Sequence, residues 1–265
     1  MSLLNAALLP HSPLLIPEIG QANYDFLAKT IDAYKKIGEE LRNTEIETII
    51  IISPHGKPQN NSFTMNVAPE MEINLQDFGF IPPKTVLSGD ALLADQIKNE
   101  LRSDYEIQLI SENILDHGSA VPLYLMKNLI GEFKTIIISP ASGLELETLS
   151  EFGKKLGNVI KNNNKKIAII ASGDLSHRLK KKSPGGYSPK GAKFDNKLIE
   201  YLNEPRTALN NILKMDANLI NDAGECGLKP LVVALGALEE KNWEPEVLAY
   251  QTDFGIGYLS FKFEF

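Results

Sequence analysis

The chain has 265 residues, of which 43% are apolar and 23% are charged, a balance typical of globular proteins. Its formal net charge of -7 disfavours nucleic acid as a partner, because phosphate backbones require a broad basic surface. No apolar run reaches the ~20 residues needed to cross a bilayer, and the single cysteine, Cys226, excludes an intramolecular disulfide. These features predict a cytoplasmic protein that binds neither nucleic acid nor a membrane.

Buried-strand patterns alternate along the chain with segments of helical spacing, an order typical of a layered α/β sheet. The predicted strands are Leu3–Leu9, Thr48–Ile52, Ile107–Ser111, Thr135–Ser139, Lys166–Ala171, Glu246–Tyr250 and Gly257–Phe263. The predicted helices are Ala22–Leu41, Ala91–Leu101, Val121–Leu129, Leu146–Ile160, Ala192–Leu202, Thr207–Leu213 and Leu228–Glu239. Because the sequence shows no internal repeat and no long linker, we expect one α/β domain over residues 1–265, with its last two strands antiparallel.

The four histidines lie in short polar or Gly/Pro-containing segments near the ends of predicted elements. His11, His55 and His177 each follow a predicted strand, and His117 precedes a predicted helix. A single histidine is more commonly a surface or core residue than a ligand, but loops at the carboxyl ends of strands converge on one crevice in an open α/β sheet. Two histidines and one carboxylate on one face form the facial triad of non-haem Fe(II) oxygenases. The placement therefore indicates a metal site.

Glu225 is the candidate for the carboxylate ligand. It lies with Cys226 between two glycines at the start of a predicted helix, where backbone can approach a metal closely. A carboxylate is also favoured at a helix start for electrostatic reasons alone, so Glu225 has an ordinary structural interpretation too. Cys226 is either a small buried apolar residue or an alternative ligand, in which case a thiolate would suit Cu(I) or Zn and disfavour oxygenase chemistry.

Five segments in order resemble the class III (LigB-type) extradiol ring-cleavage dioxygenases. They are Pro10–Gly20, Ile52–Gly56, Leu115–Gly118, Ser172–His177 and Gly224–Gly227. Each motif is weak alone, but the five in this order are specific and the similarity runs from Leu8 to about Gly257. The chain most resembles the LigB-like domain that often occurs fused to an AMMECR-type domain, within the MEMO superfamily. The resemblance implies a mostly parallel central sheet flanked by helices, often in homodimers.

The resemblance also implies roles for the site residues. His11 and His55 would be ligands of Fe(II), and the carboxylate ligand maps onto Glu225. His117 and His177 would act as the acid and base beside the metal, with a small aromatic diol and O2 as substrates. We expect His177 to take the substrate proton, since an imidazole pKa near ~6.5 suits that work, and His117 to protonate or stabilise the oxygen-derived intermediate. The two roles can be exchanged.

Two aspartates lie close to these histidines in the sequence, Asp116 and Asp174. Either can orient a histidine ring by accepting an N–H hydrogen bond, while Asp116 can equally cap the helix that follows it. Both are therefore candidates for a supporting role beside the metal or for an alternative ligand.

Three functions fit this sequence. The first is an Fe(II)-dependent extradiol dioxygenase that cleaves a catechol-type ring. The second is a MEMO-like metal-binding protein with a redox or scaffold role and no ring cleavage, a branch that uses a cysteine in roughly the region of Cys226. The third is a hydrolase or other Lewis-acid enzyme with Zn or Mn in the same place. Zn, Mn and Cu are thus the alternatives to iron.

Overall fold

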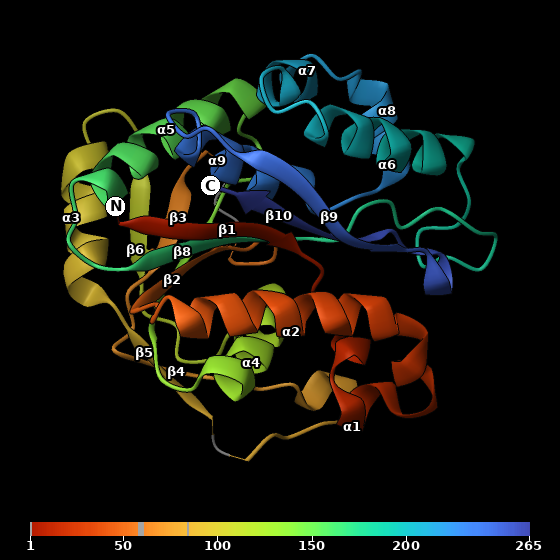
Figure 1. The fold of residues 1–265 in the computed structure, drawn as a ribbon, viewed down its shortest axis with the longest axis horizontal. Coiled ribbons are helices and arrows are strands. Elements are labelled where there is room, and N and C mark those ends of the chain that lie inside the picture. Colours follow the sequence, from red (N-terminus) through yellow and green to blue (C-terminus); the bar gives the residue numbers. More distant parts are fainter. Residues whose placement is uncertain (1, 58–60, 84) are drawn as a thin grey trace.

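The computed structural model describes residues 2–57, 61–83 and 85–265, whose strands form one sheet (Figure 1). The strands are β1 Leu3–Leu9, β2 Thr48–Ile52, β3 Phe63–Asn66, β4 Glu70–Glu72, β5 Val86–Gly89, β6 Ile107–Ile110, β7 Lys134–Ser139, β8 Ile167–Ser172, β9 Glu244–Gln251 and β10 Tyr258–Glu264. The helices are α1 Pro17–Gly20, α2 Ala28–Asn43, α3 Ala91–Leu101, α4 His117–Ile130, α5 Leu146–Lys161, α6 Pro189–Leu202, α7 Ala208–Leu213, α8 Ala217–Ala223 and α9 Leu228–Ala237.

The centre of the sheet is parallel, and its strands run in the order β4-β5-β7-β2-β8-β1-β10-β9. β8 lies between β1 and β2 and pairs with both in parallel, and β2 pairs in parallel with β7. β10 joins β1 antiparallel, and β9 joins β10 antiparallel. β3 pairs with β7 and β6 beside this path. The predicted α/β class with a mostly parallel central sheet is confirmed, as is the antiparallel pairing of the last two strands.

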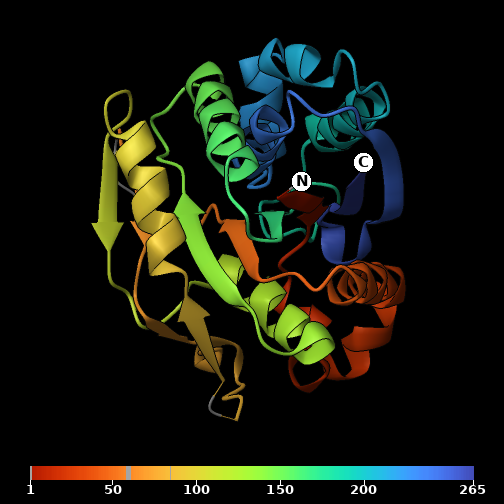
Figure 2. The same ribbon diagram turned by 60° about the vertical axis from the view of Figure 1, so that its left-hand side comes forward.

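Helices cover both faces of the sheet, and Figure 2 shows them on its two sides. The isoleucines of β2 alternate between two cores: Ile49 and Ile51 pack on the side of α2 and α4, while Ile50 and Ile52 pack on the side of α5 and α9. All four are fully buried, and each buried side chain contributes ~1.5–3 kcal/mol to folding. No helix among the described residues has the length and apolar character needed to cross a membrane.

Most predicted elements are present, with two kinds of difference. The predicted helix Ala22–Leu41 is wrong over its first turns, because residues 21–27 form a 3-10 helix and α2 begins only at Ala28. The strands β3, β4 and β5 and the helix α8 were not expected. These strands have only three or four residues each, too few for a periodic pattern, so their pairing with β7 and with each other defines them.

Candidate metal centre

The carboxyl ends of β1, β2 and β8 lie side by side and carry most of the expected site residues. His11 follows β1, His55 follows β2, and Asp174 and His177 follow β8. The loop after β8 packs on the turn before α9, since a Cβ on Gly173 would lie 2.1 Å from Gly227 Cα. This contact requires glycine at position 173 and brings Cys226, far away in sequence, to the same edge of the sheet.

Three possible metal ligands converge at this edge. The donor atoms of His11, His55 and Cys226 all lie within 4.8 Å of one another. Nε2 of His11 is 3.1 Å from Nε2 of His55 and 3.6 Å from Sγ of Cys226. His11 is buried, Cys226 is half-buried and His55 is exposed. The described residues thus include a group able to hold one metal ion.

The tautomer of His11 follows from its hydrogen bonds. Its Nδ1 lies 2.9 Å from Ser172 Oγ, and the Ser172 hydroxyl donates its proton to the Gly118 carbonyl at 2.5 Å. Because that proton is committed, Ser172 Oγ accepts the hydrogen bond and His11 Nδ1 donates it. Nε2 of His11 is therefore the unprotonated nitrogen, and its lone pair faces His55 and Cys226, as metal binding requires.

The electrostatics of the cluster favour neutral groups in the absence of a cation. Burial, and then the neighbouring His55 and His117, hold the pKa of His11 well below its usual value. Partial burial and His117 lower the pKa of His55 to about 4. Burial raises the pKa of the Cys226 thiol well above its usual value. Neutral imidazole is the ligating form, and a nearby metal cation is the agent that removes a thiol proton.

Glu225, the expected carboxylate ligand, does not join His11 and His55. Its Oε2 accepts a hydrogen bond from the Leu228 N–H at 2.6 Å, so the side chain caps the first turn of α9. Burial raises the pKa of this carboxyl to about 7. Adjacent residues at this turn point in different directions, and the structure directs Cys226 into the cluster and Glu225 to the helix. The position of Glu225 is that of a carboxylate at a helix start, the ordinary structural interpretation given above.

His117 and His177 lie beside the cluster. The His117 ring stacks on the His55 ring, with centroids 4.3 Å apart, and makes an edge contact with the Phe78 ring, with centroids 5.6 Å apart. His177 Nδ1 lies 2.8 Å from the Gly224 carbonyl oxygen, which can only accept, so Nδ1 carries the proton and Nε2 holds a free lone pair. Burial lowers the pKa of both histidines, so both favour the neutral ring.

The two aspartates have different environments. Asp116 Oδ1 accepts from Ser53 Oγ at 2.7 Å and from the Ser119 N–H at 3.0 Å, so it caps α4, as one of its two interpretations predicted. Asp174 is buried, and its Oδ2 lies 3.9 Å from Nε2 of both His11 and His177. Burial raises the pKa of Asp174 to about 7. Asp174 thus lies between His11 and His177.

Some residues of this site were not expected from the sequence. Ser172 orients His11, Ser53 binds Asp116, and Phe78 contacts His117. Ser172 directly follows a predicted strand and begins the motif Ser172–His177, and this position was the one available signal. Phe78 belongs to a short 3-10 helix, residues 76–78, which has no periodic pattern.

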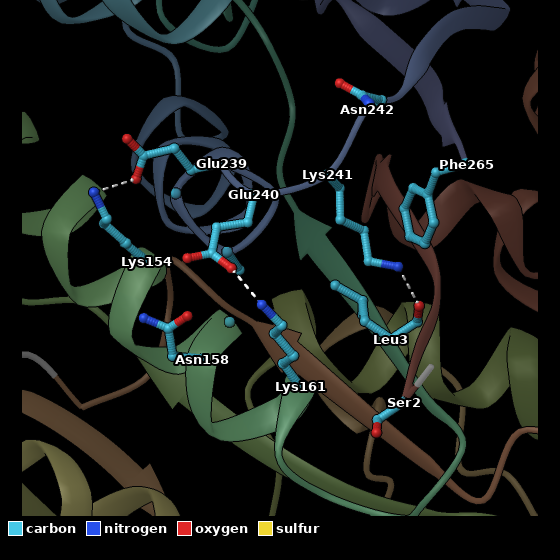
Figure 3. A pocket seen from close by; sticks show the side chains of 13 residues that line it. Ser2, Leu3, Lys154, Asn158, Lys161, Glu239, Glu240, Lys241, Asn242 and Phe265 are labelled. Carbon is cyan, nitrogen blue, oxygen red and sulfur yellow. Dashed lines mark hydrogen bonds and ion pairs between the residues drawn. The ribbon is translucent and has the colours of Figure 1, made fainter.

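A separate cavity of about 400 Å³ lies at the amino end of β1, the end opposite His11 (Figure 3). Four of its charged side chains form two ion pairs: Lys154 Nζ lies 3.0 Å from Glu239 Oε2, and Lys161 Nζ lies 2.8 Å from Glu240 Oε2. Lys241 Nζ donates to the Leu3 carbonyl at 2.7 Å. None of the described residues that line it is a histidine or cysteine. This cavity therefore lacks the imidazole and thiol groups that form the metal cluster.

Comparison with known proteins shows the family of this chain. The family described as "Catalytic LigB subunit of aromatic ring-opening dioxygenase" matches residues 5–260. Protein CA_C1420 of Clostridium acetobutylicum is 31% identical over 280 aligned positions, which cover all of this chain and 58% of that protein. The 3,4-dihydroxyphenylacetate 2,3-dioxygenase of Escherichia coli is 27% identical over 183 positions, 65% of each protein. The chain spans about three fifths of the length of these curated relatives.

The fold also recurs in a solved structure. The crystal structure of uncharacterized protein JW3007 from Escherichia coli K12 superimposes with a TM-score of 0.70 and 21% identity, over 97% of this chain and 98% of that one. At this identity the likeness concerns the fold alone. With the family match over nearly the whole sequence, the expected LigB resemblance is confirmed: this chain belongs to the family of the catalytic LigB subunit of aromatic ring-opening dioxygenases.

Proposed function

We propose that this chain holds one transition-metal ion through Nε2 of His11, Nε2 of His55 and Sγ of Cys226. The observation that carries the proposal is the convergence of these three donors within 4.8 Å. The ring of His11 is held in the tautomer that offers a lone pair, and the thiol of Cys226 loses its proton most readily when a cation binds the sulfur. Imidazole and thiolate together suit Fe, Zn or Cu better than Mn, which prefers oxygen ligands.

We further propose a dioxygenase-type reaction at this centre. An aromatic diol and O2 would give a ring-opened product that keeps both oxygen atoms, so the reaction balances without another reductant. When bound, the metal supplies Lewis acidity toward the diol hydroxyls and redox chemistry toward O2. The family and the distant dioxygenase relative support this class of reaction. Fe(II) remains the first candidate metal because the reaction uses O2.

The roles of the flanking histidines follow from their contacts. His177 donates its Nδ1 proton to the Gly224 carbonyl, so Nε2 is free to accept a proton from a diol hydroxyl. Its lowered pKa keeps the ring neutral and ready to act as a base near neutral pH. His117, stacked on His55, is the second proton-transfer group in this proposal. Phe78 beside it offers an apolar contact for an aromatic ring.

A metal-dependent redox role without ring cleavage is the second candidate function. Cys226 favours it, because a thiolate beside two imidazoles departs from the two-histidine, one-carboxylate triad of non-haem iron oxygenases. Glu225, which would complete that triad, is engaged with the start of α9. The two candidates share the same metal ligands and differ in whether an aromatic diol is consumed together with O2.

One experiment separates the candidates. The full chain is purified with little exposure to oxygen or chelators, bound metal is measured by elemental analysis, and oxygen uptake is followed with a panel of catechols. One equivalent of iron with catechol-dependent oxygen uptake supports the dioxygenase. Stoichiometric zinc or copper without uptake supports the second candidate. Failure to bind any of the three metals, even after their addition, would contradict both.

A further inference from the structure

A small cavity opens directly beside His55, on the side of the sheet edge formed by β3, β6 and β7. Its volume is about 120 Å³, room for roughly eight to twelve water-sized groups when each occupies ~10–15 Å³. The described residues that line it include His55, Gly56, Thr64, Asn66 and Ser139. The cavity therefore adjoins the metal cluster through His55 and has room for a group of a few atoms.

Two residues that line this cavity, Thr64 and Ser139, carry hydroxyl groups. Thr64 and Ser139 are opposite each other on the antiparallel strands β3 and β7, and they are 1% and 7% exposed. Neither hydroxyl forms a hydrogen bond with another of the described residues, whereas Asn66 nearby is satisfied by the backbone of Glu112. Because neither oxygen is among the fully enclosed polar atoms without a partner, both hydroxyls reach the cavity and are available to a ligand group.

Gly56 lies directly against the side chain of Ser139. A Cβ on Gly56 would lie 2.0 Å from Ser139 Oγ and 3.9 Å from Thr64 Oγ1, so a larger residue at position 56 would block access. Gly56 directly follows His55. The residue next to a candidate metal ligand thus contacts one of the two hydroxyl-bearing side chains.

The rest of the lining defines the ligand group. Lys57 and Glu112 form an ion pair at the rim, so their charges offset each other and do not select a charged group. Ile110, Ile114 and Ile137 provide apolar walls. A matching group is short, apolar along its length and uncharged but hydrogen-bonding at its end.

We infer that this cavity receives a side arm of the aromatic diol, a few atoms long and ending in an uncharged hydrogen-bonding group such as a hydroxyl. The inference rests on the proposed function, since the diol itself would bind at the metal cluster. Thr64 and Ser139 would bind the end of the arm and so determine which diols the site prefers.

Calorimetry on the metal-loaded full chain, without oxygen, tests this inference. The ligands are catechol, 4-butylcatechol and 4-(3-hydroxypropyl)catechol, whose two arms contain equal numbers of non-hydrogen atoms. We expect the hydroxypropyl compound to bind most tightly. Ser139→Ala and Thr64→Val should each weaken its binding roughly 3- to 10-fold, with a much smaller effect on the butyl compound. Ser88→Ala, on the exposed face of β5, is the matched control and should change neither.

The outcomes distinguish failure of the side-arm inference from failure of the proposed function. Equal binding of the butyl and hydroxypropyl compounds, unaffected by either variant, would overturn the inference and leave the proposed function standing. Binding of none of the three diols would overturn the dioxygenase proposal together with the inference. Bound metal and thermal unfolding, measured for each variant, identify any loss that comes from misfolding, and the two variants on different strands provide independent tests.

Discussion

Cys226 Sγ lies 3.6 Å from His11 Nε2, although the two residues come from opposite ends of the chain. The contact depends on the packing of the loop after β8 against the turn before α9, where the Asp174 carbonyl accepts hydrogen bonds from the N–H groups of Cys226 and Gly227. The Asp174 N–H in turn donates to Cys226 Sγ at 3.4 Å. The sulfur is therefore held in place by the backbone before any metal binds.

Cys226→Ala and Glu225→Ala should have opposite effects. Removing the thiol should lower metal affinity by more than about 100-fold, above the 10–100-fold effect of a group that only supports a ligand. Removing the carboxylate should leave metal affinity nearly unchanged but lower the free energy of unfolding by about 1 kcal/mol, because α9 loses its cap. Metal titration and urea unfolding measure the two quantities. The reverse pattern would restore Glu225 as the ligand.

Ser172→Ala should weaken metal binding without unfolding the chain. The substitution removes the acceptor that holds the Nδ1 proton of His11, so Nε2 is no longer fixed as the free nitrogen. We expect metal affinity to fall about 10- to 100-fold, as for other groups that orient ligand histidines. Ser150→Ala, a buried serine on α5, is the control. Equal metal affinity in both variants would show that Ser172 does not orient His11.

His177→Gln should separate metal binding from turnover. Its side chain is not part of the three-residue cluster, so the variant should keep its bound metal. If His177 takes the diol proton, the rate of oxygen uptake should fall about 10²- to 10⁴-fold. Metal content is measured on the same preparation as oxygen uptake. A variant with full metal and an unchanged rate would remove His177 from the proposed mechanism.

The sequence predicted the convergence of the histidines because the strands before them carry a local signal. Thr48–Ile52 is a run of β-branched residues that has the same bounds in the structure, and parallel neighbours bring their carboxyl ends to one edge. Once such strands are identified, His11, His55 and His177 are expected to be neighbours. The fold class and the region of the site were thus accessible from local pattern alone.

The choice between Glu225 and Cys226 was not accessible in this way. Both are plausible ligands in adjacent positions, and the direction of each depends on the turn at Gly224, whose φ is +60°, and on where α9 begins. The role of Ser172 likewise depends on the carbonyl of Gly118, 54 positions away. Such features arise from contacts between distant segments, which periodicity and composition do not encode.

Asp195 should make the stability of the chain depend on pH. It is fully buried, and its carboxylate accepts hydrogen bonds from the Ser176 N–H at 2.9 Å and the Tyr250 hydroxyl at 2.8 Å. Burial nevertheless raises its pKa from 3.8 to about 6. Between these pH values the folded chain keeps a proton that the unfolded chain has lost, so the free energy of unfolding falls as pH rises and levels off above about pH 6.

Asp195→Asn should remove this dependence. The amide oxygen can still accept from the Ser176 N–H, and the amide N–H can donate to the Tyr250 hydroxyl oxygen. Relative to the wild-type chain, the variant should gain stability as pH rises from 4 to 7, by up to about 3 kcal/mol for a shift of roughly two pKa units. Urea unfolding across this range measures the difference, with the exposed Asp25→Asn as control. A constant difference between variant and wild type would mean that Asp195 stays ionised in the folded chain.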